Sequence, residues 1–508
     1  MENTLYYGDN LKILREHIPD NSVDLIYLDP PFNSKASYNI LFKGPTGRPS
    51  EAQITAFEDT WHWTEEAEKT FQEIVEKAPA KAVKMMSAFR DFVGLNDVMA
   101  YLTMMCIRLI ELRRVLKDTG SIYLHCDPTA SHYLKILMDT VFGKENFRSE
   151  IVWCYTEREI SKKYWNKKHD VIFFYTKKAD DRHIFNWREV AIPYSPGTLE
   201  KFNYADKDGR RFQIRGKGGP YTGKQGLDIS LEKTHPNWVY RDYLDKSPGV
   251  PPRDWWPIPV INRAARERLG YPTQKPETLL EKIIKASSDK GSIVLDPFCG
   301  CGTAMAVAQR LKRKWVGIDI THLAVNLIKW RLKNQFGLIP KKDYDVVGEP
   351  ADFEGAKELA VQNRYQFQWW ALSLIGARPY GDKKKGADTG IDGYIYFIDE
   401  KGKIKSAIVS VKSGKTSVKD IRDLCHIIER EKAEVGILMT LEKPTTPMKK
   451  EGIGKGYYES PSGEKYPQIQ ILTIEEVLKG KKPALPNKLE PFKRARRHIE
   501  NQENLSML

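Results

Sequence analysis

The sequence predicts an α/β protein with a mainly parallel sheet. Short apolar runs that end at turn residues alternate with segments of amphipathic helical period along residues 1–178 and again along 261–336. Between these regions, residues 179–260 lose the alternation and are rich in Gly, Pro, Lys, Arg, Tyr and Trp. A second alternation of strands and helices follows at 358–480. We therefore expect a large α/β domain with an irregular insert, a linker at 337–357, and a smaller α/β domain.

The first region contains several strands and helices in alternation. A turn at 8–10 precedes a helix from Leu11, and the apolar run at 22–28 ends at two prolines. That run predicts a buried strand that delivers Asp29 to the carboxyl edge of the sheet. The sequence then predicts helices at 99–117 and 132–143, and strands at 120–127 and 169–177.

Regular structure returns after residue 260. We expect helices at 273–288, 303–313 and 321–336, and strands at 292–296 and 314–320. The C-terminal unit has a Trp-rich helix, strands at 392–398, 406–412 and 435–440, and a helix at 421–433. The tail at 481–508 is basic and then polar, and we expect it to fray.

Composition limits the function classes. The chain has 508 residues, of which 41% are hydrophobic, enough for real cores, so global disorder is excluded. No apolar run approaches the ~20 residues that a membrane span requires. The N-terminus does not resemble a signal peptide, and six cysteines do not form a disulfide framework. We expect a cytoplasmic protein, and a net charge of +14 suits a polyanionic partner.

A Gly-rich turn lies between a predicted strand and a predicted helix in SIVLDPFCGCGTAMAV. Gly300 and Gly302 let the backbone approach a ligand, and the helix after Thr303 presents free N–H groups. Asp319 ends the next predicted strand, where its carboxylate can accept hydrogen bonds from both ribose hydroxyls of an adenosine ligand. The third glycine of a dinucleotide fingerprint is replaced by Met305. For the loop alone, an ordinary tight turn remains the alternative.

The segment Asp29-Pro30-Pro31-Phe32 follows the apolar strand and combines a carboxylate, a proline carbonyl and an aromatic ring at one turn. This set suits a planar base with an exocyclic amine. Asp29 and the Pro30 carbonyl would accept its two N–H bonds, and Phe32 would stack on its ring. The alternative is a strand-ending turn without chemistry.

Residues 1–335 resemble a β-class DNA amino-methyltransferase. The shared blocks occur in one order, and they are YYGDN, SVDLIYLDPPF, GSIYLHCD, FGKENFRSEIVW, HDVIFFYT, YPTQKPETLLEKII, LDPFCGCGT and WVGIDI. In this class DPPF precedes DPFCGCGT. The resemblance implies a circularly permuted Rossmann-like sheet with a catalytic half at 1–178, a target-recognition region at 179–260 and a cofactor-binding half at 261–336.

The resemblance also implies S-adenosylmethionine as cofactor. Asp319 would hold the ribose, and Asp9 would lie near the adenine. The residues implied for the cofactor loop are Asp296, Phe298, Gly300, Gly302 and Thr303. Those implied near the methionine moiety are Thr273, Gln274 and Lys275. Cys301 stands where the family often has Ser, and we expect little effect from this change.

The resemblance points to a site-specific adenine methyltransferase acting on double-stranded DNA. Family members that act on cytosine N4 more often carry Ser in place of Asp29, and a cytosine-N4 enzyme remains the alternative. The transfer is an in-line displacement at a sulfonium, in which the site orients and polarises the reactants. The target base must leave the duplex, at a cost of about a few kcal/mol. No general base is obvious in the sequence.

A basic stretch lies within the predicted target-recognition region, where Gly and aromatic residues interleave the charges. Such a loop can follow phosphates and read base edges. The alternative is a solvated loop. The residues predicted to contact DNA are Arg210, Arg211, Arg215, Lys217 and Lys224.

The C-terminal unit resembles an Mrr-like restriction endonuclease domain of the PD-(D/E)xK type. Asp392 and Lys412 occupy motif positions, and the resemblance implies that Asp392 binds Mg²⁺ while Lys412 activates water. Ser410 stands where the family has an acid or Gln, and Gln366 and Gln368 stand where an acidic residue is often found. Fewer anionic ligands would weaken Mg²⁺ binding.

Together these resemblances predict a restriction–modification enzyme that joins an adenine methyltransferase to a Mg²⁺-dependent endonuclease. Two alternatives stay open for the C-terminal unit and the whole chain. The nuclease-like domain could be inactive and bind DNA only, or both enzymatic sites could have decayed. The oligomeric state also stays open, with a homodimer as one alternative.

Overall fold

The computed structural model describes the chain except residues 32–36, 44–48, 59–61, 156–161, 164, 167, 247, 263, 272, 381–389, 400 and 487–508. Within the described residues, no helix is both long and apolar enough to cross a bilayer. Phe32, which was predicted to stack on the target base, and most of the predicted tail lie outside these residues.

A nine-stranded sheet forms the large domain, in the order β11-β6-β7-β5-β2-β12-β13-β1-β14. Strand β7 is antiparallel to both of its neighbours, and the other pairs are parallel. The predicted α/β class with a mainly parallel sheet is therefore confirmed. The strands are β1 Thr4–Tyr7, β2 Val23–Leu28, β5 Leu116–Cys126, β6 Phe147–Cys154, β7 His169–Thr176, β11 Trp255–Pro257, β12 Ile293–Asp296, β13 Lys314–Asp319 and β14 Asp345–Val347.

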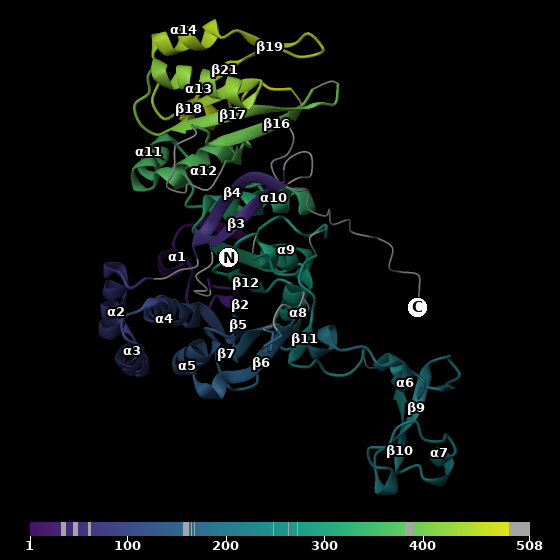
Figure 1. Cartoon of the computed structure of the whole chain (residues 1–508). Coiled ribbons are helices and arrows are strands. Elements are labelled where there is room, and N and C mark those ends of the chain that lie inside the picture. The colour runs from purple at the N-terminus through teal and green to yellow at the C-terminus, as the bar shows by residue number, and fades with distance from the viewer. Residues whose placement is uncertain are drawn as a thin grey trace.

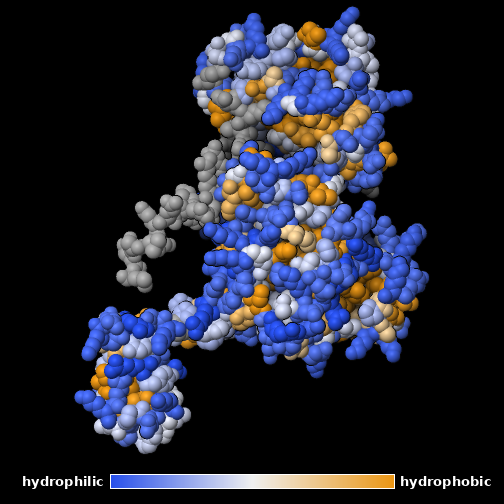
Figure 2. All heavy atoms as spheres, turned by 180° about the vertical axis from the view of Figure 1, so that it is seen from behind, coloured by the Kyte–Doolittle hydropathy of each residue, from blue (hydrophilic) through white to orange (hydrophobic). Residues whose placement is uncertain are grey.

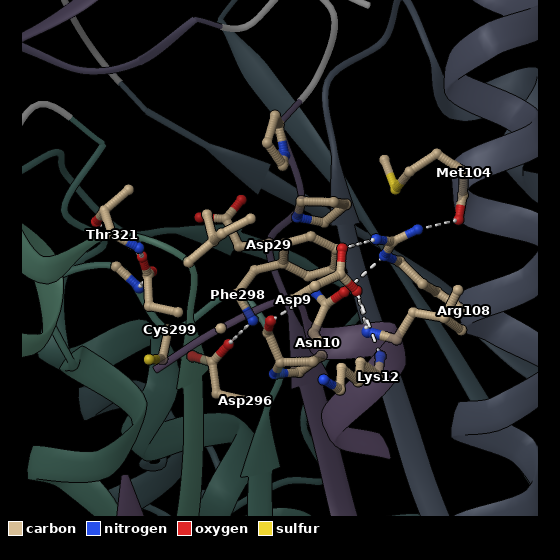
Figure 3. A pocket seen from close by; sticks show the side chains of 18 of the residues that line it. Asp9, Asn10, Lys12, Asp29, Met104, Arg108, Asp296, Phe298, Cys299 and Thr321 are labelled. Atoms are coloured by element: carbon tan, nitrogen blue, oxygen red, sulfur yellow. Dashed lines mark hydrogen bonds and ion pairs between the residues drawn. The ribbon is translucent and has the colours of Figure 1, made fainter. Parts of the chain in front are cut away.

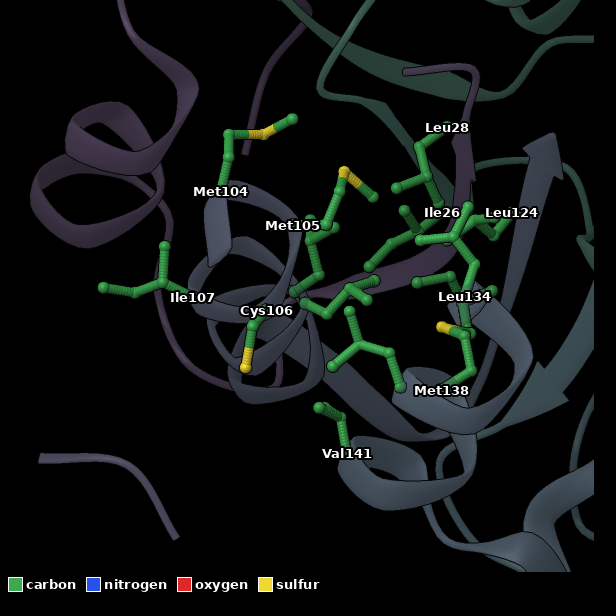
Figure 4. Packing of buried hydrophobic residues seen from close by; sticks show 14 of the residues in the cluster. Ile26, Leu28, Met104, Met105, Cys106, Ile107, Leu124, Leu134, Met138 and Val141 are labelled. Carbon is green, nitrogen blue, oxygen red and sulfur yellow. The ribbon is translucent and has the colours of Figure 1, made fainter. Parts of the chain in front are cut away.

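Helices cover both faces of this sheet (Figure 1). One face packs on a Met-rich core, which contains Met105, Met138 and Ile26 of β2 (Figure 4). The helices of this face are α1 Asn10–His17, α2 Glu65–Lys77, α3 Ala80–Val93, α4 Asp97–Val115 and α5 Ser131–Phe142. The other face packs against α8 Glu277–Ser287, α9 Thr303–Arg310 and α10 His322–Phe336. Strand β2 is apolar on both sides because both faces of the sheet are covered.

The segment predicted as an irregular insert contains a small antiparallel sheet in the order β10-β9-β8. Its strands are β8 Tyr204–Ala205, β9 Arg211–Gly216 and β10 Val239–Tyr243, with the short helices α6 Pro196–Leu199 and α7 Leu231–Thr234 beside them. Phe212, Ile214 and Val239 form its core. The period-two spacing of Phe212 and Ile214 was the only sequence signal of β9, and basic residues flank it. The insert projects from the body as a largely hydrophilic lobe (Figure 2).

The segment predicted as a linker, 337–357, is partly regular. Its strand β14 pairs in parallel with β1 at the edge of the large sheet, and helix α11 Phe353–Gln362 begins within it. A three-residue strand carries too little periodicity to be recognised from sequence. A separate hairpin of β3 Ser37–Lys43 and β4 Pro49–Glu58 follows the Asp-Pro-Pro turn.

The C-terminal domain has a five-stranded sheet in the order β15-β16-β17-β18-β21, with apolar cores on both faces. The strands are β15 Arg378–Pro379, β16 Gly393–Ile398, β17 Ile404–Lys412, β18 Val435–Thr440 and β21 Ile469–Thr473, and a hairpin adds β19 Tyr457–Glu459 and β20 Lys465–Pro467. Its further helices are α12 Arg364–Leu374, α13 Val418–Glu431, α14 Thr446–Gly454 and α15 Ile474–Leu478. Helix α12 contacts α10 of the large domain (Figure 1).

Candidate active site

A cavity of about 880 Å³ lies at the carboxyl edge of the large sheet, where β2, β12 and β13 end. Ligands bind at this edge in open α/β sheets because the loops after the strands converge there. The cavity brings together the predicted residues Asp9, Asp29, Pro30, Pro31, Thr273, Gln274, Lys275, Asp296, Phe298, Gly300, Thr303 and Asp319. Figure 3 shows Asp9, Asp29, Asp296 and Phe298 pointing into one region from separate elements. Gly302 does not line the cavity.

The Gly-rich loop requires glycine at both predicted positions. Gly300 and Gly302 have φ values of +48° and +75°, in the left-handed region that favours glycine. A Cβ at Gly302 would lie 2.8 Å from Cγ1 of Ile328 in α10. Gly302 therefore serves the packing of the loop on α10, whereas Gly300 lines the cavity.

Met305 stands where a dinucleotide fingerprint has its third glycine. In this structure a glycine of β13, Gly317, leaves the space that the third glycine would otherwise provide. A Cβ at Gly317 of β13 would lie only 2.1 Å from Sδ of Met305. The third glycine of the fingerprint allows a helix to pack closely on a strand. Here the strand provides that space at Gly317, and the Met305 side chain fills it.

Asp319 joins the end of β13 to the Gly-rich loop. Its Oδ2 accepts from the Gly300 N–H at 2.9 Å, and its Oδ1 accepts from the N–H and Oγ1 of Thr321, both at 2.9 Å. Burial outweighs these hydrogen bonds and raises the pKa of Asp319 to about 6. Burial also raises the pKa of Asp296, whose Oδ1 accepts from the Phe298 N–H at 3.1 Å.

Asp9 caps the N-terminus of α1, where its Oδ1 accepts from the Leu11 N–H at 2.7 Å. Arg108 of α4 holds this turn by donating to Asp9 Oδ2 at 2.8 Å and to Asn10 Oδ1 at 2.6 Å (Figure 3). Asn10 in turn donates to the Pro297 carbonyl at 2.8 Å. Arg108 was missed by the sequence reasoning, because a basic residue in a helical pattern gives no signal of its partner.

Asp29 has two oxygens in different environments. Lys275 Nζ donates to Oδ2 at 2.6 Å. Oδ1 is buried and has no hydrogen-bond partner among the described residues. A buried acceptor without a donor is costly for a folded protein, so an N–H donor that reached Oδ1 would stabilise this site.

A buried network lies directly behind Asp29. His125 of β5 is fully buried, and its Nδ1 lies 3.8 Å from Asp29 Oδ1 and 3.0 Å from the Tyr27 hydroxyl. Its Nε2 lies 3.1 Å from Asp170 Oδ2, and Tyr155 donates to the other oxygen of Asp170 at 3.2 Å. Burial would raise the pKa of Asp170, but its hydrogen bonds, first that with His125, hold it below its usual value. The sequence signal was a histidine at the end of a buried strand.

Arg331 of α10 stabilises the Gly-rich loop through hydrogen bonds. Its buried guanidinium donates to the Cys301 carbonyl at 3.1 Å and to Thr303 Oγ1 at 3.2 Å. It also donates to Glu277 at 2.7 Å, and Glu277 opens α8 just after Lys275. One buried cation therefore connects the loop to the segment that carries Lys275.

The residues predicted to contact DNA divide into two groups. The three arginines bond within the lobe: Arg210 to Asp245 at 2.8 and 3.0 Å, Arg211 to the carbonyls of Phe202 and Leu199, and Arg215 to Asp242 at 3.4 Å. Lys217 is exposed and makes no ion pair with the described residues. Lys224 is exposed near the Tyr221 ring, with 5.8 Å from Nζ to the ring centroid. The two exposed lysines are compatible with the predicted DNA contacts, which stay a prediction.

An aromatic cluster lies beside these lysines. The rings of His235 and Trp238 stack with centroids 4.9 Å apart, and Tyr221 lies 6.2 Å from Trp238. Trp238 remains 39% exposed. The sequence did not predict this cluster, because Tyr221 comes beside the other two rings only through the pairing of β9 and β10.

The Asp392 and Lys412 pair does not form a magnesium site with the other residues that the structure describes. Asp392 Oδ1 accepts from Gln368 Nε2 at 2.5 Å, and its Oδ2 accepts from the Val411 N–H at 2.6 Å. Ser410 and Gln368 bring no further carboxylate. Over the part of the chain that the structure describes, no group of three or more His, Cys, Asp and Glu side chains could hold a metal ion. Mg²⁺ prefers carboxylate oxygens, so this donor set does not fit the predicted metal.

Comparisons with known proteins match the two domains to two different families. A family model described as "DNA methylase" matches residues 23–329, and one described as "NACHT-associated inactive Restriction Endonuclease 1" matches residues 365–479. The chain is 29% identical over 282 residues to the type II methyltransferase M.EcaI of Enterobacter cloacae, covering 48% of this chain and 60% of that protein. The chain therefore spans about three fifths of the length of that relative.

Two further similarities were found. The chain is 28% identical over 318 residues to the DNA adenine methyltransferase YhdJ of Escherichia coli, covering 62% of this chain and 78% of that protein. Among solved structures, a putative DNA modification methylase from Thermus thermophilus, complexed with S-adenosyl-L-methionine, has 15% identity and a TM-score of 0.35. That alignment covers 68% of this chain and 99% of the other.

Proposed function

The chain belongs to the DNA methylase family, and from this premise we propose that it methylates the N6 amine of adenine in double-stranded DNA with S-adenosylmethionine. The observation that carries the proposal is Asp29 in the cavity. One of its oxygens is held by Lys275, and the other is a buried acceptor without a donor among the described residues. The restriction–modification role suggested by the type II relative is part of the same proposal.

The cavity residues fit the cofactor. Two glycines at positive φ shape the loop, and Asp319 presents its carboxylate at the end of β13. In this proposal Asp319 accepts from the ribose hydroxyls, and Thr273, Gln274 and Lys275 lie near the methionine moiety. When bound, S-adenosylmethionine supplies an electrophilic methyl group on a sulfonium. The work of the protein is to place the amine nitrogen in line with that methyl group.

Asp29 orients the target amine. With Lys275 fixing Oδ2, Oδ1 accepts one N–H bond, and the Pro30 carbonyl accepts the second. These bonds favour a pyramidal amine, in which the nitrogen lone pair leaves its conjugation with the ring and points toward the methyl group. The nitrogen forms its bond to the methyl carbon as the carbon–sulfur bond breaks, and the electron pair of that bond stays on sulfur. The nitrogen then carries a positive charge and loses one proton. We assign Asp29 Oδ1 as the acceptor of that proton.

The test is methylation of unmethylated plasmid, followed by mass spectrometry of the digested nucleosides. We expect N6-methyladenine, whereas N4-methylcytosine would support the alternative base. Asp29→Ala should lose methyl transfer and keep cofactor binding, because Asp29 acts on the base. Methylation at the normal rate by this variant would contradict the role of Asp29.

For the C-terminal domain we propose that it does not cleave DNA, in place of the Mg²⁺-dependent endonuclease that the sequence predicted. The support is the donor set: one carboxylate, Asp392, already accepts two N–H bonds. Plasmid incubated with the full chain and Mg²⁺, with and without S-adenosylmethionine, should stay intact. Discrete fragments that disappear in Lys412→Ala would overturn this proposal.

A further inference from the structure

Helix α12 of the C-terminal domain has two glutamines that face different parts of the molecule. Gln368 donates from Nε2 to Asp392 Oδ1 inside its own domain. Gln366 accepts at Oε1 from the backbone N–H of His322, at 3.2 Å, in the large domain. Two glutamine side chains on one helix therefore form hydrogen bonds with two different domains.

The Gln366 contact lies at the N-terminus of α10, beside the turn that carries Asp319. His322 is the first residue of α10, and the first N–H groups of a helix have no partner within the helix. The Thr321 side chain caps α10 by accepting from the Ala324 N–H at 3.2 Å. Thr321 also bonds Asp319 through both its N–H and its hydroxyl. Gln366 thus completes the cap of the turn that carries Asp319.

Trp369 makes a second contact with the same region. It packs against a buried cluster formed by Leu269, Tyr271, Cys301, Leu323, Ala324 and Leu327. Cys301 lies between the two glycines of the cofactor loop. A Cβ at Gly300 would lie 3.2 Å from the Tyr271 ring, so this ring lies directly against the loop. Trp369 therefore supports the loop through apolar packing, in addition to the hydrogen bonds from Arg331.

We propose that α12 is a positioning element of the cofactor site, through Gln366 and Trp369. The nuclease-like domain would then contribute to S-adenosylmethionine affinity instead of cutting DNA. The inference rests on the proposed function, because it assumes that the cofactor binds between the Gly-rich loop and Asp319. Neither residue touches the cavity. Gln366 acts through His322, which directly follows the lining residue Thr321, and Trp369 acts through a cluster that includes the lining residues Tyr271 and Cys301.

The test compares matched variants of the full chain, with S-adenosylmethionine as the probe in calorimetry and in initial-rate kinetics. Gln366→Ala should raise Kd and KM for the cofactor about three- to tenfold, the effect of one lost hydrogen bond, with kcat unchanged. Gln366→Glu keeps an acceptor oxygen for the His322 N–H and should restore affinity. Gln368→Ala removes the equivalent bond inside the C-terminal domain and should leave Kd unchanged.

Trp369→Phe tests the packing contact and should also raise Kd, with the circular dichroism spectrum retained. Equal Kd values for Gln366→Ala and Gln368→Ala would overturn the inference, as would an unchanged Kd in both Gln366→Ala and Trp369→Phe. If Gln366→Ala failed to fold, Gln366→Glu and Trp369→Phe would decide. Failure of the unmodified chain to bind the cofactor would instead refute the proposed function itself.

Discussion

In the proposed site, where the Asp319 carboxylate accepts from the ribose hydroxyls, Asp319 would couple cofactor binding to pH. Burial raises its pKa to about 6, above the ordinary value of 3.8. For folding, the raised pKa means that this carboxyl contributes most to stability below pH 3.8 and that its contribution is lost as pH rises through about 6, since ionisation is costlier in the folded state. For binding the sign is reversed, because ribose hydroxyls donate to the carboxylate form.

We therefore expect S-adenosylmethionine affinity to fall as pH drops below about 6, by roughly tenfold per unit once the carboxyl is mostly protonated. Calorimetry between pH 5 and 8, at fixed ionic strength, measures this. The control is Asp319→Asn, which should bind weakly without this pH dependence. An unchanged affinity through pH 5 in the unmodified chain would contradict the role of Asp319.

His125 lies behind Asp29, with Nδ1 3.8 Å from Asp29 Oδ1, and we propose that it positions Asp29. His125→Asn should lower kcat by up to about 100-fold, the scale expected when a reacting group shifts by about an ångström. Its effect on cofactor Kd should be small, because its bonds to Tyr27 and Asp170 lie behind Asp29. Cys126→Ala is the matched control, since Cys126 is the next buried residue of β5 and faces the opposite core. Equal kcat losses in both variants would indicate a general effect on folding.

At the scale of elements, α9 packs closely on β13 because Gly317 has no side chain. Gly317→Ala places a Cβ where Met305 Sδ lies, and overpacking of this kind costs about 1–3 kcal/mol of unfolding free energy. Adding Met305→Ala removes the clashing atom but leaves a cavity of its own, so the double variant should lose less stability than the sum of the two single losses. Denaturant unfolding measures both effects. Gly414→Ala is the control, because its Cβ would meet nothing within 4 Å.

The elements also show what sequence could and could not predict. Long apolar or amphipathic segments such as β2, α4 and α10 were recognised because their periodicity spans several turns or the whole strand. Strands β8 and β14 were missed, since two or three residues define no period. The cavity residues were predicted from local motifs. Arg108 and Arg331 were missed, and Gln366 was noted only as a departure from the nuclease motif, because the partners of all three are distant in sequence and are fixed only by the fold.

At the scale of the whole molecule, the net charge of +14 and the basic residues of the projecting lobe favour binding to DNA. We expect DNA affinity to fall with salt, and the double variant Lys217→Ala, Lys224→Ala should reduce the log–log salt slope by about two, since each phosphate contact contributes about 0.9. Fluorescence anisotropy across a salt series measures the slope. Lys479→Ala is the control, because Lys479 pairs with Glu475 in the C-terminal domain. A slope that the double variant leaves unchanged would place the phosphate contacts elsewhere.

Strand β14 also determines where the molecule could be cut. Cleavage of the chain after residue 336 would remove the strand that covers β1, although the segment beyond 336 looks like a dispensable connection in the sequence. The N–H and C=O groups of β1 would then form an open edge, which invites pairing with a second chain. We infer that the fragment 1–336 would aggregate. A soluble methyltransferase fragment would have to retain Asp345–Val347.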